Sequence, residues 1–457
     1  MDKSKVQFAS KLGLLLATLG SAVGLGSVWR FPAEVQTNGG GAFLLIFILC
    51  TIVLGIPVML AEFAIGRAGR GDTVSSLEKL GGKKLGWSVG GLALLAGLLI
   101  LSFYIVVCGW TFEYFCASIS GDLFSGFDAN SAEADIKSAL TRKMDFMVHS
   151  TWMPLIATFL MLATTIGIVA GGVRGGIERL SKLLMPALFI ILALFVVVAA
   201  MTPGALDGYR YFLEPDFSKI SADTVLAALG QAFFSLSLGM GLLITYGSYF
   251  PKTTNMCSTA VSVALLGLLV AVMMGMIIFP LVLTFGHGDA DVQGTTLIFM
   301  TMPELFVYLP MSQLWSILFF FLLLVAAITS CVSVAEALVA LAIKRLKMER
   351  ITACLLVLAI LTPLSALCSL SQMTDTSFTV GGITVFDLFN NFATNYMLPL
   401  GSAALCVWLG WFAPKDLFRE QLTNKGTLRI WYFGFIRFSL RFIAPILIMY
   451  IFIKSII

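Results

Sequence analysis

The chain has 457 residues, of which 59% are hydrophobic and only 12% are charged, whereas a soluble globular domain carries about 25% charged residues. A water-soluble fold needs polar surface that this composition does not supply, so we expect an integral membrane protein whose main solvent is the lipid bilayer. The net charge of +4 is small for this length and the basic residues are scattered, so nucleic acid is not an expected partner.

The cysteines and histidines argue against metalloenzymes and hydrolases. The eight cysteines lie mostly in apolar runs and form no CxxC pair, which is typical of small buried residues and not of zinc ligands or a disulfide set. Only two histidines occur, His149 and His287, and both lie in polar connections. No enzyme activity is therefore expected.

Eleven apolar runs are long enough to cross the hydrocarbon core, which takes about 20 residues of helix. In chain order they are residues 11–36, 41–66, 87–117, 151–171, 178–201, 222–250, 257–285, 313–343, 350–369, 384–412 and 431–456. The first run has no small-residue cleavage site at its end, so no cleavable signal is expected. The longest polar connections are too short for a separate domain, and residues 1–457 are predicted to form one single membrane domain.

Basic residues are unevenly distributed between alternate connections. Five lie between residues 67 and 84, three between 174 and 182, and four between 344 and 350, whereas the alternate connections 119–150 and 203–221 hold three and two. Because Lys and Arg concentrate on the cytoplasmic side, the amino terminus is predicted inside. With eleven spans, the carboxyl terminus is then outside. The expected location is the cell inner (plasma) membrane.

Glycine and serine interrupt two of the predicted spans near the middle of the membrane. The first span is broken at residues 20–27 and the sixth at residues 231–241, and glycine lowers helix stability by roughly 1 kcal/mol relative to alanine. Close helix packing explains one such segment. Two of them, in matching positions of a five-helix unit repeated once, indicate a transporter site where unwound backbone faces a substrate or an ion.

The chain resembles the bacterial amino-acid transporter branch of the neurotransmitter:sodium symporter family. The matching motifs are GSAVGLGSVWRFP from Gly20, NGGGAF from Asn38, GIERLSKLLMP from Gly175, GQAFFSLSLGMG from Gly230 and AITSCVSVAE from Ala327. The resemblance implies an all-α polytopic membrane protein with a leucine-transporter-like fold, in which spans 3, 4, 8 and 9 form a scaffold. It has two inverted five-helix repeats with broken helices 1 and 6. They are spans 1–5 (residues 1–202) and spans 6–10 (residues 222–412), followed by an eleventh, additional helix (residues 431–456).

The resemblance implies a sodium site whose ligands this chain retains. The family uses backbone carbonyls of the first span together with a small residue and two hydroxyls of the eighth span. Oxygen donors of this kind suit a hard cation. The matching positions are Gly20, Val23, Ala326, Thr329 and Ser330. The two hydroxyls could instead bond back to the preceding helical turn.

The first sodium site of the family is degraded in this chain, whereas the retained set matches the second. The family usually supplies Asn at Ser27, Thr or Ser at Ser235 and Asn at Gly267, so only the carbonyl of Ala22, two hydroxyls and a substrate carboxylate remain. That is too few for a tight site. One turn after Gly267, where the family places a chloride-binding serine or an acidic residue, this chain has Ala271. Losing one sodium ion and one negative charge together preserves local charge balance. We therefore expect one sodium ion and no chloride requirement.

For the substrate site, the resemblance implies a neutral hydrophobic or aromatic amino acid. Gly24 stands where amine-transporting relatives place an aspartate, so a ligand that brings its own carboxylate fits better. That carboxylate would meet the N–H groups of Leu25 and Gly26 and the Tyr104 hydroxyl, at the positive end of a half-helix. The uncharged lining favours an apolar side chain. The expected contacts are Ser21, Ala22, Gly24, Leu25, Gly26, Ile100, Tyr104, Phe234, Ser235, Ser237, Met240, Ser330 and Val334.

The resemblance also implies a backbone brace and an outer gate. Glu62 is a carboxylate inside the second span, where it is costly without partners, and it would brace the unwound backbone. Tyr104 and Phe234 would close the substrate pocket. Arg30 matches the outer-gate arginine of the family, but its aspartate partner is replaced by Asn390, so a charge-assisted hydrogen bond is expected in place of a salt bridge.

The inner gate is altered at three positions, where Lys5, Phe8 and Lys344 replace an Arg, a Trp and an Asp of the family. The family's salt bridge cannot form between two lysines, so we expect an inner gate that opens more readily. Other inner-gate positions are Ser248, Tyr249 and Glu336.

These features together predict a secondary active transporter that couples sodium to the uptake of a neutral amino acid by alternating access. Two alternatives keep the same fold. One is a sodium-independent transporter that works by proton coupling, exchange or uniport, which the intact sodium set disfavours. The other is a non-transporting amino-acid sensor, which would carry a fused soluble domain. The expected partners are an amino acid and the lipid bilayer, and the sequence carries no signal for an oligomeric state.

Overall fold

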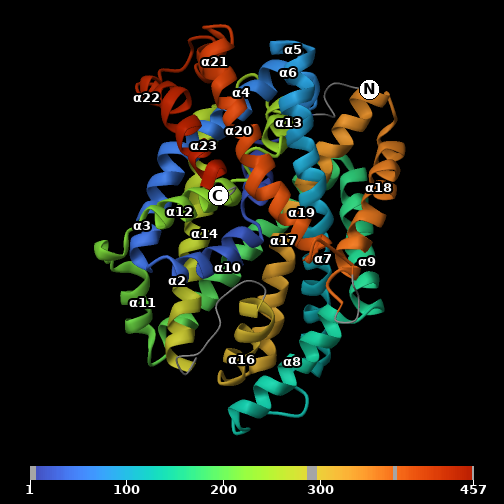
Figure 1. Ribbon diagram of the computed structural model, residues 1–457, viewed down its shortest axis with the longest axis vertical. Coiled ribbons are helices and arrows are strands. Elements are labelled where there is room, and N and C mark those ends of the chain that lie inside the picture. Colours follow the sequence, from blue (N-terminus) through green and yellow to red (C-terminus); the bar gives the residue numbers. More distant parts are fainter. Residues whose placement is uncertain (1–6, 286–295, 374–377, 455–457) are drawn as a thin grey trace.

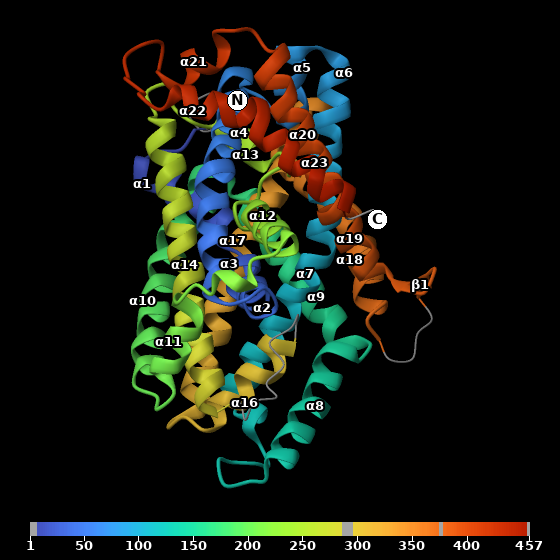
Figure 2. The same ribbon diagram turned by 60° about the vertical axis from the view of Figure 1, so that its left-hand side comes forward.

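The structure is a computed structural model that describes residues 7–285, 296–373 and 378–454. It is almost entirely helical (Figures 1 and 2). Within those ranges, nine helical stretches are long and apolar enough to cross a membrane, and the bent pair Lys11–Ala22 and Gly26–Thr37 makes a tenth. The chain is therefore an all-helical polytopic membrane protein with a broken first span.

The long helices follow the expected apolar runs, with ends shifted by a few residues. In chain order they are α1 (Lys11–Ala22) with α2 (Phe31–Thr37), α3 (Gly41–Cys50) with α4 (Ile56–Gly69), α7 (Gly91–Ser120), α9 (Trp152–Ala170), α10 (Arg179–Ala200), α12 (Ala222–Ser235) with α13 (Leu242–Ser248), α14 (Met256–Phe285), α17 (Ser312–Leu346), α18 (Arg350–Leu370), α19 (Val385–Asn391) with α20 (Leu398–Val407), and α22 (Phe433–Phe438) with α23 (Ala444–Lys454). The connections hold α5 (Thr73–Gly81), α6 (Lys83–Leu85), α8 (Glu133–His149), α11 (Ala205–Leu213), α16 (Met302–Val307), α21 (Leu417–Leu422) and a two-stranded antiparallel hairpin of β1 (Thr379–Val380) and β2 (Ile383–Thr384).

The sixth expected span consists of two helices that are each too short to cross a membrane. α12 has 14 residues and α13 has 7 residues, and the six residues 236–241 between them are not helical. The glycine and serine runs of the first and sixth spans therefore coincide with the two breaks in the helices.

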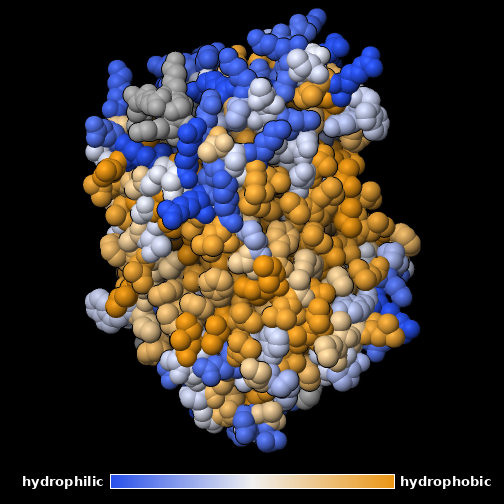
Figure 3. All heavy atoms as spheres, turned by 180° about the vertical axis from the view of Figure 1, so that it is seen from behind, coloured by the Kyte–Doolittle hydropathy of each residue, from blue (hydrophilic) through white to orange (hydrophobic). Residues whose placement is uncertain are grey.

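The connections gather at the two ends of the bundle. In Figure 1, α5, α6 and α21 lie at the top, and α8, α11 and α16 lie at the bottom. Figure 3 shows a broad band of hydrophobic side chains between two more hydrophilic ends. The helices α8, α11 and α16 belong to the connections 119–150, 203–221 and 286–312, which the inside position of the amino terminus predicts outside, so the described parts of these connections share one end. At the carboxyl-terminal end of α23, Lys454 lies 3.9 Å from Asp223 in the first turn of α12.

Contacts between the long helices agree with a scaffold and two related halves. α17 packs along α7, and both helices contact α9 and α18, which are the spans 3, 4, 8 and 9 expected to form the scaffold. α3 and α4 lie against α12 and α13, whereas α14 lies against α1 and α2. Span 2 thus flanks the broken span 6, and span 7 flanks the broken span 1. This exchange of neighbours is the one that two inverted repeats require, and the repeat boundaries at residues 1–202 and 222–412 stay a prediction.

Candidate functional site

The break in the first span exposes backbone groups that side chains from other helices meet. α1 ends at Ala22, and the helix axis turns by 55° before α2. The Leu25 N–H donates to the Tyr104 hydroxyl at 2.8 Å, and the Ser237 hydroxyl donates to the Ser21 carbonyl at 2.7 Å. These two backbone groups are thus satisfied in a place where water is excluded.

The break in the sixth span is held open by backbone that helices do not adopt. Ser237 and Gly239 have positive φ angles of 53° and 80°, in the left-handed region where glycine is at little disadvantage. The Gly239 N–H donates to the Glu62 carboxylate at 2.7 Å, so Glu62 contacts the unwound backbone that it was expected to brace. Thr73 also donates its hydroxyl to the Gly241 carbonyl at 2.5 Å. Sequence reasoning missed Thr73, because its connection precedes the break by more than a hundred residues.

The two breaks face one small cavity of about 30 Å³. Twelve of the thirteen expected substrate contacts line it, and the exception is Leu25, which reaches the site through its N–H group. Leu101 and Cys331 also line the cavity and were not predicted. Both directly follow a predicted contact on the same helix, so helical adjacency could have indicated them.

Gly24 lies at a close approach of three elements. A Cβ atom added there would lie 2.5 Å from the Ser330 hydroxyl and 2.7 Å from the Tyr104 hydroxyl, so a larger residue requires these neighbours to move. The rest of the lining is apolar or carries hydroxyls, and no Asp, Glu, Lys or Arg side chain takes part among the described residues. The cavity thus has no charge to pair with a ligand of net charge, whereas half-helix N–H groups can meet a carboxylate.

The retained sodium set lies where α1 ends against α17. The Ser330 hydroxyl donates to the Gly20 carbonyl at 3.3 Å, and a Cβ atom at Gly20 would lie 3.2 Å from the Cβ of Thr329. The Thr329 hydroxyl donates to the Val325 and Ala326 carbonyls at 3.0 and 3.1 Å. This is the hydrogen bonding to the preceding helical turn that was the alternative to sodium binding for this residue. The surroundings are buried and supply carbonyl and hydroxyl oxygens, which fit a sodium ion.

The degraded set lies where the segment after the first break meets α12 and α14. The Ser27 hydroxyl is buried and has no hydrogen-bond partner among the described residues, and the Ser235 hydroxyl accepts from the Gln231 amide at 2.9 Å. A Cβ atom added at Gly267 would meet nothing within 4 Å in the described chain, so the missing amide leaves open space. These positions offer the carbonyl of Ala22 and two hydroxyls, whereas the retained set offers three carbonyls and two hydroxyls.

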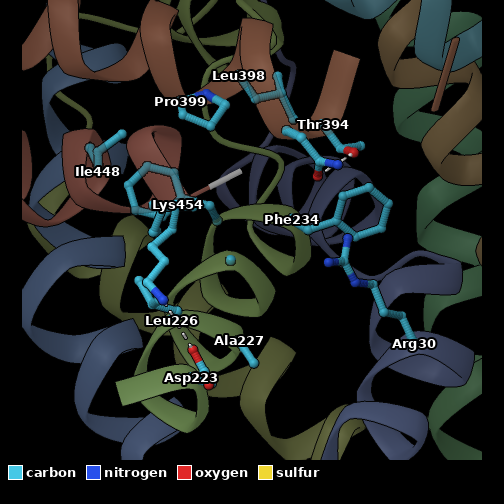
Figure 4. A pocket seen from close by; sticks show the side chains of 14 residues that line it. Arg30, Asp223, Leu226, Ala227, Phe234, Thr394, Leu398, Pro399, Ile448 and Lys454 are labelled. Carbon is cyan, nitrogen blue, oxygen red and sulfur yellow. Dashed lines mark hydrogen bonds and ion pairs between the residues drawn. The ribbon is translucent and has the colours of Figure 1, made fainter. Parts of the chain in front are cut away.

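On the side expected outside, the arginine gate differs from the prediction. The Arg30 guanidinium lies over the Phe234 ring, 5.1 Å from its centroid (Figure 4). It pairs with Glu34 at 3.3 Å. The expected hydrogen bond between Arg30 and Asn390 is not formed within the described ranges. The reason is local: Glu34 lies one turn after Arg30 on the same helix, and a carboxylate is a stronger partner for guanidinium than an amide.

The inner side is closed by aromatic packing and a buried carboxylate. The Phe8 ring packs edge-on against Tyr246 at a centroid distance of 5.8 Å. The Tyr249 hydroxyl donates to Glu336 at 2.8 Å, and Arg350 forms an ion pair with the same carboxylate. Sequence reasoning missed Arg350, although it begins the helix that follows Glu336. The last expected member, Ser248, bonds within its own turn, and its carbonyl accepts from Arg70.

The structure gives little information on the two lysines of the inner gate. Lys5 lies outside the described residues, and Lys344 is exposed at the end of α17. The segment before α1 is held by other contacts. Glu178 accepts from the Ala9 N–H at 2.7 Å and from the Ser10 hydroxyl at 2.8 Å, and Arg174 donates to the Gln7 carbonyl at 2.8 Å. The expected loosening of the inner gate therefore remains a prediction.

Known proteins that resemble this chain are transporters. A model of the sodium:neurotransmitter symporter family matches residues 5–134 and 135–457. The uncharacterized sodium-dependent transporter YhdH of Bacillus subtilis (strain 168) is 34% identical over 459 residues, which are 100% of this chain and 98% of the relative. The sodium-dependent dopamine transporter of Bos taurus is 26% identical, over 98% of this chain and 68% of its own length.

A solved structure of MhsT in complex with L-phenylalanine superposes with a TM-score of 0.88 and 37% sequence identity, covering 98% of this chain and 99% of MhsT. At this identity the fold is shared, and the family model covers almost the whole chain. The chain therefore belongs to the sodium:neurotransmitter symporter family and is a multi-pass, sodium-dependent membrane transporter, not an enzyme.

Proposed function

We propose that this transporter carries a neutral amino acid with a hydrophobic or aromatic side chain into the cell, together with one sodium ion and without chloride. The observation that carries the substrate class is the crowding at Gly24, where the Ser330 and Tyr104 hydroxyls leave no space for an acidic side chain. A ligand with its own carboxylate needs no such acid. The similarity to MhsT, whose solved complex holds L-phenylalanine, supports the same class.

Ser330 provides a physical link between the ion and the substrate. It lines the substrate cavity and also bonds to the Gly20 carbonyl of the retained sodium set. A sodium ion held by Gly20, Val23, Ala326, Thr329 and Ser330 would supply positive charge beside the broken helix. The unwound N–H groups of Leu25 and Gly26 would then bind the carboxylate of the amino acid, with the Tyr104 hydroxyl beside them.

One ion is sufficient to concentrate the substrate. A sodium ion that moves inward through ~100 mV gains roughly 2.3 kcal/mol from the potential, and a tenfold concentration gradient adds about 1.4 kcal/mol. Together they support a substrate gradient of roughly several hundred-fold. The sparse ligands around Ser27, Ser235 and Gly267 support the assignment of one ion, and Ala271 supports independence from chloride.

The orientation is part of the proposal. The basic connections put the amino terminus in the cytoplasm and the carboxyl terminus outside, in agreement with the contact between Lys454 and the first turn of α12. A reporter that is active only in the periplasm, fused after the last residue, should give signal. Signal from a reporter that works only in the cytoplasm would contradict this orientation.

Uptake of labelled L-phenylalanine into proteoliposomes tests the function. With an inward sodium gradient in a chloride-free buffer we expect accumulation above the external concentration, and with potassium in place of sodium we expect none. Accumulation driven equally well by a proton gradient without sodium would contradict the proposal. Binding without transport would favour the sensor alternative.

A further inference from the structure

A second cavity lies at the end of the molecule that carries α8, away from the broken helices. It is lined by the last turns of α7, by the turn that follows this helix, by α8 and by the start of α9, and it is open to the surface. Figures 1 and 2 show α8 leaving the bundle at the bottom beside α7. None of the described residues that line it lines the substrate cavity.

The cavity contains a buried carboxylate that is not satisfied by the protein. Glu113 on α7 is only 4% exposed, and neither of its carboxylate oxygens has a hydrogen-bond partner in the described chain. An unpaired carboxylate inside a span is costly, and such groups normally have a partner. Packing between α7 and α9 occurs one turn earlier, where a Cβ atom at Gly109 would lie 2.8 Å from the Thr158 nitrogen. Glu113 lines the cavity just beyond this contact.

A guanidinium of opposite charge lines the same cavity from α8. Arg142 is exposed and forms no ion pair or hydrogen bond with any residue that the structure describes. The other two charges are engaged locally, because Lys143 donates to the Asp122 carbonyl and the Ser125 hydroxyl, and Asp122 accepts from Ser120. The Glu113 carboxylate and the Arg142 guanidinium, neither of which has a partner among the described residues, thus belong to two side chains that line the same cavity.

The remaining wall is apolar. Leu123 and Met147 are buried there, and Phe146 and Met153 line the cavity from α8 and α9. The four charged groups sum to zero, so the cavity favours a ligand without net charge that carries both signs. A cationic end suits Glu113, an anionic end suits Arg142, and an apolar part suits the wall.

We propose that this cavity is a second binding site, specific for the zwitterion of an apolar amino acid. The Glu113 carboxylate holds the ammonium group, and Arg142 holds the carboxylate of the ligand. The ligand then connects α8 to α7, the helix that also supplies Ile100 and Tyr104 to the substrate cavity. Glu113 follows Tyr104 by nine residues, or about 14 Å along the helix axis.

Cys116 provides a reporter for this site. It lines the cavity and is exposed, whereas the other seven cysteines of the chain are buried. A water-soluble fluorescent maleimide should therefore label purified protein at Cys116, and Cys116→Ser should remove the labelling. With L-phenylalanine at ten times its dissociation constant, we expect labelling to slow by about tenfold, since only the free fraction reacts.

Variants of the two charged groups test the assignment. Glu113→Gln and Arg142→Gln should each label at the same rate with and without L-phenylalanine. Ser120 lines the cavity but carries no charge, so Ser120→Ala should keep the protection. Arg142 is exposed, so its variant is unaffected by burial costs. Phenethylamine, which lacks the carboxylate, should protect far less than L-phenylalanine.

The central site must be separated from this one. Gly24→Asp blocks the substrate cavity and should leave the protection of Cys116 intact, while Glu113→Gln should retain L-phenylalanine uptake. Wild-type protein that does not label, or that labels equally fast with L-phenylalanine, would overturn the second site. So would protection that survives in Glu113→Gln, that disappears in Gly24→Asp, or that phenethylamine provides equally well.

Discussion

Two regions beside the same broken helix differ in how well they can hold a cation. At the end of α1, carbonyl and hydroxyl oxygens from two helices meet, and Ser330 bonds across to Gly20. Just beyond the break, Ser27 is buried and has no partner in the part of the chain that the structure describes, and Gly267 on α14 leaves open space. Both regions contact the substrate segment, so position alone does not make an ion site. We propose that the number of converging oxygen atoms decides which region binds the ion, because a hard cation needs several of them.

The largest effect is expected from removing the hydroxyls of the retained region. Thr329→Ala combined with Ser330→Ala removes two of the five proposed ligands, so sodium stimulation of L-phenylalanine uptake should disappear. Initial rates in proteoliposomes at a series of sodium concentrations measure this. Thr329→Ser keeps the oxygen atom and serves as the matched control. Full sodium stimulation in the double variant would show that the ion binds elsewhere.

A loss of nearly the same size is expected at the residue between the two regions. Gly24→Asp places a side chain where a Cβ atom already lies 2.5 Å from the Ser330 hydroxyl, and adds a negative charge where a carboxylate should bind. Uptake should fall by tenfold or more, and a tenfold loss of affinity corresponds to about 1.4 kcal/mol of binding free energy. Undiminished L-phenylalanine uptake would disprove the proposed position of the substrate carboxylate.

A moderate effect is expected from Tyr104→Phe. The hydroxyl accepts the Leu25 N–H at 2.8 Å, and its loss leaves a buried donor unpaired at a cost of about 1–3 kcal/mol. The KM for L-phenylalanine should rise by about tenfold, and sodium dependence should persist because the ion ligands are untouched. Phe103→Tyr, on the neighbouring position of α7, is a control for helix packing. A changed sodium affinity with an unchanged KM for L-phenylalanine would show that Tyr104 acts on the ion and not on the substrate.

The smallest effects are expected in the degraded region. Ser27→Ala removes a hydroxyl that makes no hydrogen bond to the described residues, and Gly267→Ala adds a methyl group in open space. Uptake should change by less than about twofold in both, and Gly267→Ala should raise thermal stability slightly, because alanine favours a helix by up to ~1 kcal/mol over glycine. A large loss of sodium affinity in Ser27→Ala would show that this region binds an ion after all.

Much of the fold follows from patterns that are local in the chain. Apolar runs of about 20 residues predict the spans, and glycine-rich runs predict the two breaks because they weaken helices within a few residues. The substrate contacts were assigned through motifs of the family, and the structure brings twelve of the thirteen around one cavity.

What could not be predicted depends on contacts between distant segments. The bonds of Thr73 to Gly241 and of Glu178 to Ala9 join parts of the chain that are more than 160 residues apart. The partner of Arg30 was also missed, although Glu34 lies only four residues further along the chain. The resemblance to the family predicted Asn390 as the partner of Arg30, and the nearby carboxylate of Glu34 was not considered.

The ratio of charge to substrate tests the central claim most directly. Current and labelled L-phenylalanine uptake are measured together in proteoliposomes at a fixed membrane potential and sodium gradient. A neutral amino acid that moves with one sodium ion and without chloride predicts one elementary charge per substrate molecule. A ratio of two would show that the degraded region still binds and transports a second ion, and would contradict the account.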